Sequence, residues 1–394
     1  MSNLITAPPA PAASPPRQRR LGRRGTRLLL LGGTVLVLAI LPLYLDTQML
    51  KIGSWSMAAA VGAVGLTLLV GTAGQLSLAH AFFAAVGAYG YAFLASPDAG
   101  WGWPPALAAL GGILLAAAAG LAFSPVAARV HGLYLGVASL GLVFIGQHLL
   151  KNLKPLTGGV NGRSVQPFSL FGFELTGANP AFEVFGIPFG AQERMWYLTL
   201  FSLLVAMSLA TGIITRRPGR ALTMVRDNQP AAAALGINVQ HYKAAAFVVS
   251  SAFAGGAGVL TGLAYAYLTP QNFGLPMSIN FLVMVLIGGL GSVGGAVLGA
   301  VIVTATPLLL ASLAANTGLL ATGGTGGYDA ATVSSILFGV LVIVLIILEP
   351  GGLVRLGQRL WARVQRRPAA TGNALETVPP RAATGRDNPG KESP

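Results

Sequence analysis

The sequence predicts an all-α, polytopic integral membrane protein with about ten transmembrane or re-entrant helices and both termini in the cytoplasm. Three observations carry this prediction. Of the 394 residues, 54% are hydrophobic and only 9% are charged, whereas about 25% of the residues in a soluble globular protein are charged. Long apolar runs follow one another along most of the chain, and no charged residue lies near the middle of a run. The arginines instead gather in clusters between the runs and at their ends.

The apolar runs predict the individual helices. A helix needs about 20 apolar residues to cross the hydrocarbon core, because its backbone polar groups must all be satisfied internally. Eight runs approach this length and predict one span each: residues 28–45, 54–71, 76–95, 104–123, 132–150, 195–214, 243–267 and 332–348. A ninth apolar stretch, residues 279–314, is too long for a single crossing.

The positive-inside rule resolves the ninth stretch. The arginine-rich N-terminus starts inside, and after six spans the four arginines of residues 216–226 are inside as well. The C-terminal arginine cluster that begins at Arg355 should also be inside, which requires an even number of crossings. We therefore expect residues 279–314 to form two segments separated at residues 288–292, which gives ten in total.

The two ends of the chain are predicted to lack a packed structure. Residues 1–27 are rich in Ala, Pro and Ser and carry six arginines directly before the first apolar run, so they predict a disordered basic tail. No small-residue cleavage site follows, which argues against a cleaved signal peptide. Residues 356–394 are basic, and almost no aliphatic residue occurs from residue 368 on, so we expect a largely disordered tail there. The transmembrane domain is then residues 28–355.

Two segments are interrupted by glycines, one near residues 71–74 and one at residues 288–295. Such breaks free backbone groups at membrane depth, which is tolerable only where they are buried or line a cavity. In many transporters, related breaks in the two halves mark the pathway. Our hypothesis is that the translocation path is lined by Gly74, Gln75, Ser77, His80, Gly288, Gly289, Gly291 and Ser292. Close helix packing through small residues is the alternative explanation for any one of these glycines, and His80 serves equally well as a packing residue or a solute contact.

The residue types present exclude most enzymes and metal proteins. The chain has no cysteine, which removes disulfides and metal sites built on thiolates. The four histidines lie on different segments with no carboxylate at helical spacing, so we expect no metal site. No pair of catalytic groups falls within one apolar segment, and we expect no catalytic residue. The formal net charge of +14 lies in the tails and loops, where it indicates sidedness rather than nucleic-acid binding.

The sequence also bears on two possible energy sources, a proton gradient and ATP bound by the chain itself. Proton-coupled carriers bury an Asp or Glu in the membrane, but here every carboxylate falls in a loop or at the end of a span. Gly385, Gly390 and Lys391 have the spacing of a phosphate-binding loop, but Glu392 stands where a Ser or Thr hydroxyl must reach Mg²⁺. We therefore expect the chain to bind no cofactor and no ATP of its own.

The loop at residues 215–242 predicts a compact helix and turn on the cytoplasmic side. Pro218 and Pro230 punctuate it, Ala231–Ala234 favour a short helix, and Gly236 can end that helix. If the loop served only to fix the topology, its arginines would be sufficient, and the alanine-rich helix and the glycine that ends it would have no explanation.

Ordered motifs run along the chain. They are GQLSLAHAFFAAVGAYGYAFL at 74–94, RVHGLYLGVASLGLVFI at 129–145, TGGVNG at 157–162, GRALTMVRDNQPAAAALGINVQHYKAAAFVVSSAFAGGAG at 219–258, GGLGSVGGAVLGA at 288–300 and EPGGL at 349–353. With these motifs the chain resembles the permease family of branched-chain amino acid ABC transporters, and specifically the longer of the two permease subunits. The resemblance covers roughly residues 28–355.

The resemblance implies a multi-pass pore subunit in the lipid of the cytoplasmic (inner) membrane. Its implied partners are a second permease subunit, two ABC ATPases that bind the ATP, and an extracytoplasmic solute-binding protein. It also implies that an ATPase-docking loop contains Arg220, Arg226, Asp227, Ala231, Ala232 and Gly236. On this basis we expect Arg220 or Arg226 to meet acidic groups of the ATPase.

The expected function is inward movement of hydrophobic, branched-chain amino acids, driven by ATP hydrolysis on the partner subunits. The same family also includes urea and short-amide permeases, which the sequence separates poorly from amino-acid permeases. A secondary carrier or channel is the second alternative. The missing intramembrane carboxylate and the predicted cytoplasmic helix argue against it.

Overall fold

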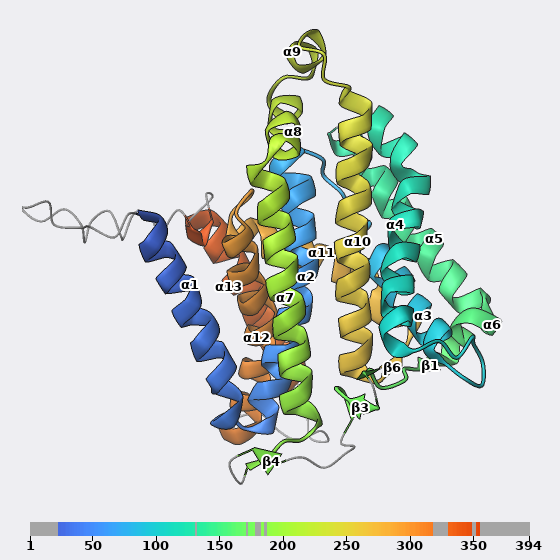
Figure 1. Ribbon diagram of the computed structural model, residues 1–394, viewed down its shortest axis with the longest axis vertical. Coiled ribbons are helices and arrows are strands. Elements are labelled where there is room, and N and C mark those ends of the chain that lie inside the picture. The colour runs from blue at the N-terminus through green and yellow to red at the C-terminus, as the bar shows by residue number, and fades with distance from the viewer. Residues whose placement is uncertain are drawn as a thin grey trace, which may run out of the picture. The chain divides into compact units, whose positions relative to one another are not determined.

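The computed structural model of the chain describes residues 23–130, 132–170, 172–177, 183–184, 187–317, 330–348 and 352–354. These residues form a helical protein in which long helices run roughly alongside one another (Figure 1). Helix α1 begins at Arg23, so the last five residues of the predicted N-terminal tail are helical. The remainder of that tail and the whole predicted C-terminal tail lie outside the described residues.

The first half of the chain contains helices α1 to α6 and the helical turns η1 to η3. Their bounds are α1 (Arg23–Ile40), η1 (Leu41–Leu43), α2 (Thr47–Leu66), η2 (Thr67–Thr72), α3 (His80–Ala95), α4 (Pro105–Arg129), α5 (Leu133–Asn152), α6 (Lys154–Thr157) and η3 (Gly159–Asn161). The second half contains α7 (Ala191–Thr215), α8 (Arg217–Asp227), α9 (Gln229–Ala234), α10 (Val239–Tyr265), η4 (Pro270–Phe273), α11 (Leu275–Gly288), α12 (Val293–Thr317) and α13 (Ala330–Leu348).

Each predicted apolar run contains a helix, and the predicted interruption of the ninth stretch is confirmed. Helix α11 ends at Gly288, and α12 begins at Val293. Between them Gly289 has φ 107° and Gly291 has φ 81°, a backbone conformation that a right-handed helix cannot contain. Within the described residues, six helices are long and apolar enough to cross a membrane, and four apolar helices are shorter.

Helix α2 lies at the centre of the helices and is buried along most of its length. It packs against α7, α10, α11 and α12, and glycines bring the partners close. The place of a Cβ on Gly62 is occupied by the Phe281 ring, and the Gly65 carbonyl accepts a hydrogen bond of 2.9 Å from Ser250 Oγ on α10. Small residues allow such close approach between membrane helices.

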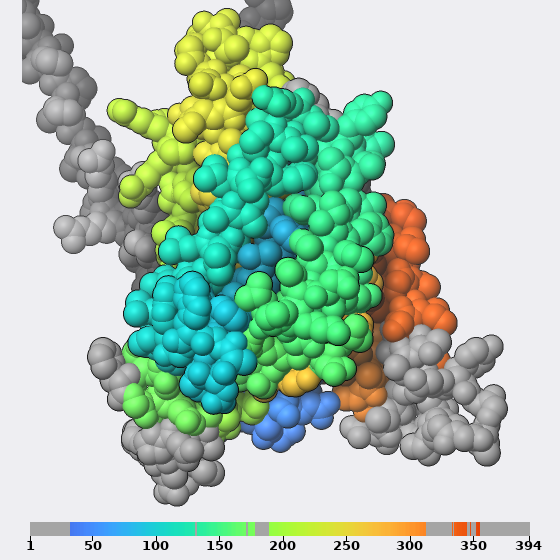
Figure 2. Space-filling model, turned by 90° about the vertical axis from the view of Figure 1, so that its right-hand side faces the viewer, coloured from blue at the N-terminus to red at the C-terminus, as the bar shows by residue number. Residues whose placement is uncertain are grey.

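Helices α4 and α5 lie on the face seen in Figure 2, in teal and green. Both expose large apolar side chains, among them Leu110, Leu114 and Leu121 on α4 and Val137, Phe144 and Ile145 on α5. In a membrane such surfaces face lipid or another helix, because their apolar side chains carry no polar group that needs a hydrogen-bond partner.

Three two-residue ladders are the exceptions to the predicted all-α class. Strands β1 (Arg163–Ser164) and β6 (Tyr267–Leu268) pair antiparallel, with Arg163 opposite Leu268. The other two ladders lie within the segment between α6 and α7: β2 (Ser169–Leu170) with β3 (Phe173–Glu174), and β4 (Glu183–Val184) with β5 (Ile187–Pro188). All three lie at the opposite end of the long helices from α8 and α9 (Figure 1).

Candidate coupling and translocation site

The first glycine-interrupted segment is an irregular connection between α2 and α3. Helix α2 continues into η2, which is a π-helical turn, and no helix follows until His80 begins α3. Gly74 has φ 68°, so the chain turns there in a conformation that favours glycine. π-Helical turns concentrate at functional sites, and this one directly precedes the predicted path residues.

Two other helices, α5 and α11, and the preceding turn η2 hydrogen-bond to this connection and to the first turn of α3. The Leu78 N–H donates to Ser139 Oγ on α5 at 2.8 Å. The Ala81 N–H donates to Ser278 Oγ on α11 at 3.1 Å, and the Gln75 N–H donates to the Leu69 carbonyl in η2 at 3.1 Å. These hydrogen bonds tie the connection to α5 and η2 and the start of α3 to α11.

The polar side chains of the connection are buried. Gln75, Ser77 and His80 are only 4%, 1% and 1% exposed. The two side-chain polar atoms of Gln75 and the Nε2 atom of His80 have no hydrogen-bond partner among the described residues. Buried polar atoms without partners are rare in proteins, so these atoms distinguish the connection from an ordinary packed core.

The second glycine-interrupted segment lies directly against the first. A Cβ on Gly71 would collide with the backbone nitrogen of Gly291. A Cβ on Gly352, from the C-terminal EPGGL motif, would meet Gly289 in the same way. Ser292 Oγ accepts from the Gly295 N–H at 3.1 Å at the start of α12. The structure thus brings together the two breaks that the sequence placed more than 200 residues apart.

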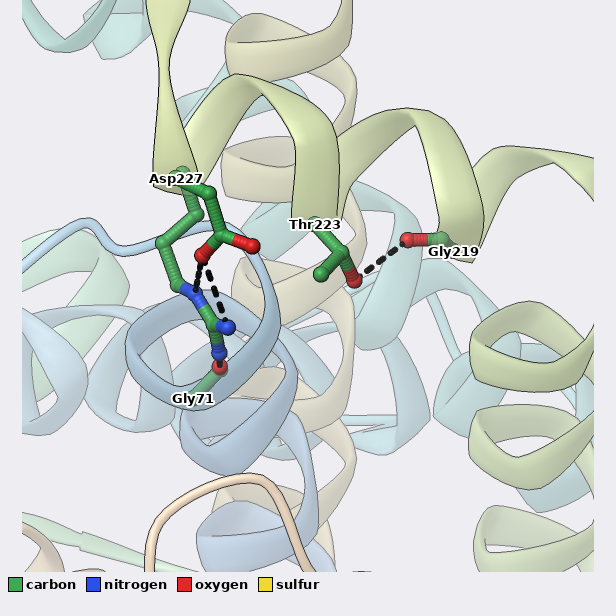
Figure 3. A network of polar contacts seen from close by, with 5 residues as sticks. Gly71, Gly219, Thr223 and Asp227 are labelled. Atoms are coloured by element: carbon green, nitrogen blue, oxygen red, sulfur yellow. Dashed lines mark hydrogen bonds and ion pairs between the residues drawn. The ribbon is translucent and has the colours of Figure 1, made fainter. Parts of the chain in front are cut away.

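Arg226 connects the loop helix α8 to the first of these two breaks. Its Nη1 donates to the Gly71 carbonyl at 2.6 Å, and its Nε and Nη2 both lie 2.9 Å from Asp227 Oδ1. Figure 3 shows the resulting link between Asp227 on α8 and Gly71 at the end of η2. A Cβ on Gly74 would lie 2.5 Å from Arg226 Cγ, so the arginine stem also covers the second glycine of the break.

The loop arginines therefore differ from one another. We expected Arg220 or Arg226 to meet acidic groups on an ATPase, but the Arg226 guanidinium is engaged within its own chain. Arg220 is exposed on α8. The sequence could not distinguish them, because the partner of Arg226 is a backbone carbonyl 155 residues away.

Helix α9 confirms the predicted short helix and its glycine stop. The Asn228 side chain caps its start by accepting from the Ala231 N–H at 3.0 Å. At its end the Gly236 N–H donates to Ala233 and the Ile237 N–H to Ala232, with Gly236 at φ 82°. This is a Schellman motif, which needs a left-handed residue after the helix.

Sequence analysis missed the link from α9 to α10. Lys243 on α10 is only 3% exposed, and its Nζ donates to Gln229 Oε1 at 3.1 Å. Ala232 faces inward and is buried, whereas Ala231 is exposed. A basic residue four positions after the helix start gave no signal by itself, because its partner lies on another helix.

Sequence analysis also missed a buried arginine in the loop after α6. Arg163 donates to the carbonyls of Leu156 and Ala99 at 2.8 and 2.7 Å and lies over the Phe93 ring. Burial lowers the pKa of its guanidinium, but an arginine remains charged at neutral pH. Arg163 thus fixes the TGGVNG motif against the end of α3.

No cluster of three or more His, Asp or Glu side chains that suits a metal occurs in the described part of the chain.

Comparisons with known proteins identify the family of the chain. A family model described as "Branched-chain amino acid transport system / permease component" matches residues 48–346. The high-affinity branched-chain amino acid transport system permease protein LivM of Escherichia coli (strain K12) is 31% identical over 331 residues, or 81% of this chain and 73% of that protein. LivH of Salmonella typhimurium, named as a permease protein of the same kind of system, is 28% identical over 271 residues, or 66% of this chain and 84% of that protein. No solved structure matches the chain significantly.

Proposed function

The chain belongs to the family of branched-chain amino acid transport permease components, and from that membership we propose that it forms one half of the pore of an ABC importer for branched-chain amino acids. The observation that carries this proposal is the contact between the loop helix α8 and the first glycine break, which in turn packs against the second. An importer driven by partner ATPases needs such a connection between its docking loop and its membrane segments, whereas a channel or secondary carrier does not.

The proposed topology has ten segments in the inner membrane of the cell, with both termini in the cytoplasm. The six long apolar helices and the four shorter ones support this count. The arginines of α8 and of the N-terminus support the sidedness, because cytoplasmic loops carry an excess of Lys and Arg. Under this topology α8 and α9 face the cytoplasm, and β1 and β6 face the outside.

The proposed partners are a second permease, two ABC ATPases and an extracytoplasmic solute-binding protein, all in or at a lipid bilayer. The similarity to both LivM and LivH supports pairing with a second, different permease, because both proteins occur in Escherichia coli. The higher identity and the larger share of this chain that is matched favour LivM as the counterpart of this chain. ATP is bound by the partner ATPases, and this chain performs no covalent chemistry.

The proposed mechanism is alternating access driven through α8 and α9. Closure of the ATPases pushes these helices, and Arg226 passes the displacement to the Gly71 carbonyl. Because Gly71 packs against Gly291, the α2–α3 connection and the α11–α12 connection shift together. The proposed path residues from Gly74 to His80 and from Gly288 to Ser292 then open on the cytoplasmic side.

The test is transport by the whole complex in proteoliposomes, with the binding protein encoded beside this chain. We expect uptake of leucine, isoleucine or valine that requires both ATP and the binding protein. Vesicles with an ATPase variant that cannot hydrolyse ATP provide the matched control. Uptake of urea or acetamide without amino-acid uptake would replace the substrate assignment, and uptake without ATP would refute the importer mechanism.

A further inference from the structure

Helix α9, which lies at the ends of α8 and α10 (Figure 1), carries a single polar side chain. Its sequence is QPAAAA, so Gln229 is the one residue of α9 whose side chain can form a hydrogen bond. Gln229 Oε1 accepts from Lys243 Nζ on α10 at 3.1 Å. Within residues 217–243, all of which the structure describes, no other side-chain hydrogen bond joins α9 to another helix. Side-chain hydrogen bonding between α9 and its neighbours therefore depends on this one contact.

The turn between α9 and α10 is tightly defined. Only residues 235–238 separate the two helices. The Schellman motif at Gly236 ends α9, and the Asn238 side chain caps α10 by accepting from the His241 N–H at 3.1 Å. The hydrogen bond from Lys243 to Gln229 closes this pair of helices at its open end. Helix α9 is thus fastened to α10 at both ends of the turn.

The connection between α9 and α8 is different. Asn228 alone separates the two helices, and its backbone is extended. The Asn228 side chain bonds to the Ala231 N–H within α9 itself and not to α8. The hydrogen bonds of the loop therefore associate α9 with α10 more closely than with α8.

Lys243 occupies an energetically unfavourable position. It is only 3% exposed, and an ammonium group removed from water loses hydration that one neutral amide oxygen replaces only in part. An apolar side chain of similar length would fill the same space without this penalty, and such replacements of buried charges are often neutral or stabilising. Stability alone therefore does not account for a lysine at this position.

The same face of α10 reaches the first glycine break. Ser250 follows Lys243 by seven residues, or two helical turns and about 10 Å along the axis, and both side chains are buried. Ser250 Oγ donates to the Gly65 carbonyl of α2 at 2.9 Å. A Cβ on Gly65 would lie 2.3 Å from Phe253 Cβ, so α10 and α2 are in close contact there. Two residues later, at Thr67, the π-helical turn η2 begins.

We propose that Lys243 is a positioning residue that makes α9 a rigid extension of α10. A displacement of α9 then moves α10, and the Ser250–Gly65 contact carries it to α2 directly before η2. This route shares no residue with the contact between Arg226 and Gly71, so the docking loop reaches the first break by two separate connections. Because Lys243 is buried, it acts through α9 and not by contact with an ATPase. The inference rests on the proposed ATP-driven import.

The first test compares leucine uptake with ATP hydrolysis in the reconstituted complex. Lys243→Met removes the ammonium and keeps an unbranched apolar side chain. We expect leucine uptake per ATP hydrolysed to fall roughly fivefold or more, since hydrogen bonds to charged groups are among the stronger ones. The ATPases stay bound, and the thermal unfolding temperature of the complex stays the same or rises. Lys51→Met makes the same change at an exposed lysine near the start of α2 and should couple as wild type.

Variants of Gln229 test the contact from its other side. Gln229→Glu keeps an acceptor for Lys243 and turns the contact into an ion pair, so it should retain coupling. Gln229→Leu removes the acceptor and should uncouple uptake from ATP hydrolysis. Combining Gln229→Lys with Lys243→Gln reverses donor and acceptor, and the double variant should couple better than either single variant.

The second test measures the attachment of α9 without transport. Hydrogen exchange of the whole complex, without solute, reports how often the amides of residues 231–237 open. Lys243→Met should raise their exchange rates several-fold, whereas Lys51→Met should leave them unchanged.

Four results overturn the inference. They are wild-type uptake per ATP in Lys243→Met, unchanged exchange of residues 231–237 in that variant, loss of coupling in Gln229→Glu equal to that in Gln229→Leu, and loss of the assembled complex in Lys243→Met. The last result would assign Lys243 to stability alone. A wild-type complex without ATP-dependent amino-acid uptake refutes the proposed function instead, and the exchange measurement still tests the attachment of α9.

Discussion

Arg226 lies in the proposed docking loop but makes its closest contacts inside its own chain. Its charged hydrogen bond to Gly71 belongs to a class that contributes about 1.5–3 kcal/mol. Because the side chain is 42% exposed, water screens part of that contribution and leaves the low end of this range. We expect Arg226→Ala to lower solute uptake roughly tenfold while the ATPases still bind and hydrolyse ATP. Paired uptake and ATPase assays on reconstituted vesicles measure this uncoupling.

Arg220→Ala is the matched control for Arg226→Ala. Arg220 is exposed on the same helix, so its loss should weaken ATPase binding in a salt-dependent manner, as exposed ion pairs are screened. Equal phenotypes for the two variants, or normal coupling in Arg226→Ala, would show that the contact with Gly71 does not transmit movement.

Gly236 isolates the effect of backbone conformation. No atom lies within 4 Å of the Cβ that an alanine would add there, and φ is 82°. Gly236→Ala should therefore cost about 1–2 kcal/mol from the left-handed conformation alone, and it should loosen the end of α9. We expect lower thermal stability of the assembled complex and reduced coupling of ATP hydrolysis to uptake.

Gly212→Ala provides the comparison for Gly236→Ala. Gly212 lies inside α7 with equally open space around it, and alanine in a helix interior is favoured over glycine by about 0.5–1 kcal/mol. Gly212→Ala should leave the complex as stable as wild type or slightly more stable. A Gly236→Ala complex that matches it in thermal unfolding would exclude a conformational role for Gly236.

At the scale of elements, the contact between the two breaks makes a further prediction. Gly71→Ala would push its methyl group into the backbone at Gly291, and overpacking of this kind costs about 1–3 kcal/mol. We expect the two connections to separate and uptake to fall, while the complex still assembles. Gly294→Ala, where nothing lies within 4 Å of the new Cβ, should transport normally. Loss of assembly in Gly71→Ala would favour the packing explanation of the break.

Hydropathy predicted the helices well but their ends less well. The predicted span at 54–71 begins seven residues late, because α2 starts at Thr47 and carries polar residues such as Lys51 before it becomes apolar. Composition marks only the apolar part of a helix, and helical hydrogen bonding continues beyond it. The breaks at Gly74 and Gly291 were predictable, because glycine is the residue that most readily adopts a positive φ.

The contacts within the candidate site were not predictable from one sequence. The hydrogen bond from Arg226 to Gly71, the packing of Gly71 on Gly291 and the link from Lys243 to Gln229 all depend on how separate helices meet. An apolar run likewise does not indicate which helix is central. Helices α2 and α4 are both long and apolar enough to be predicted as membrane spans, yet α2 is mostly buried and α4 is largely exposed.

At the scale of the whole molecule, the proposed topology makes a simple prediction. Single cysteines at Gly25, Asn228 and Gln365 should react only with reagents that reach the cytoplasm, and one at Leu170 should react from outside. The native chain provides a clean background, because it contains no cysteine. Labelling of residue 365 from the outside would show an odd number of crossings and refute the ten-segment arrangement.

The central position of α2 has a consequence for how the protein is made. Helix α2 leaves the ribosome early, but Ser250, the α10 residue bonded to Gly65, is synthesised 185 residues later. At about 5–20 residues per second, this delay is roughly 10–40 seconds. During that time the small-residue surface of α2 faces lipid or an insertion factor instead of its permanent neighbours. Biogenesis of this permease therefore depends on a helix that is inserted second and enclosed only after α10, α11 and α12 have followed it into the membrane.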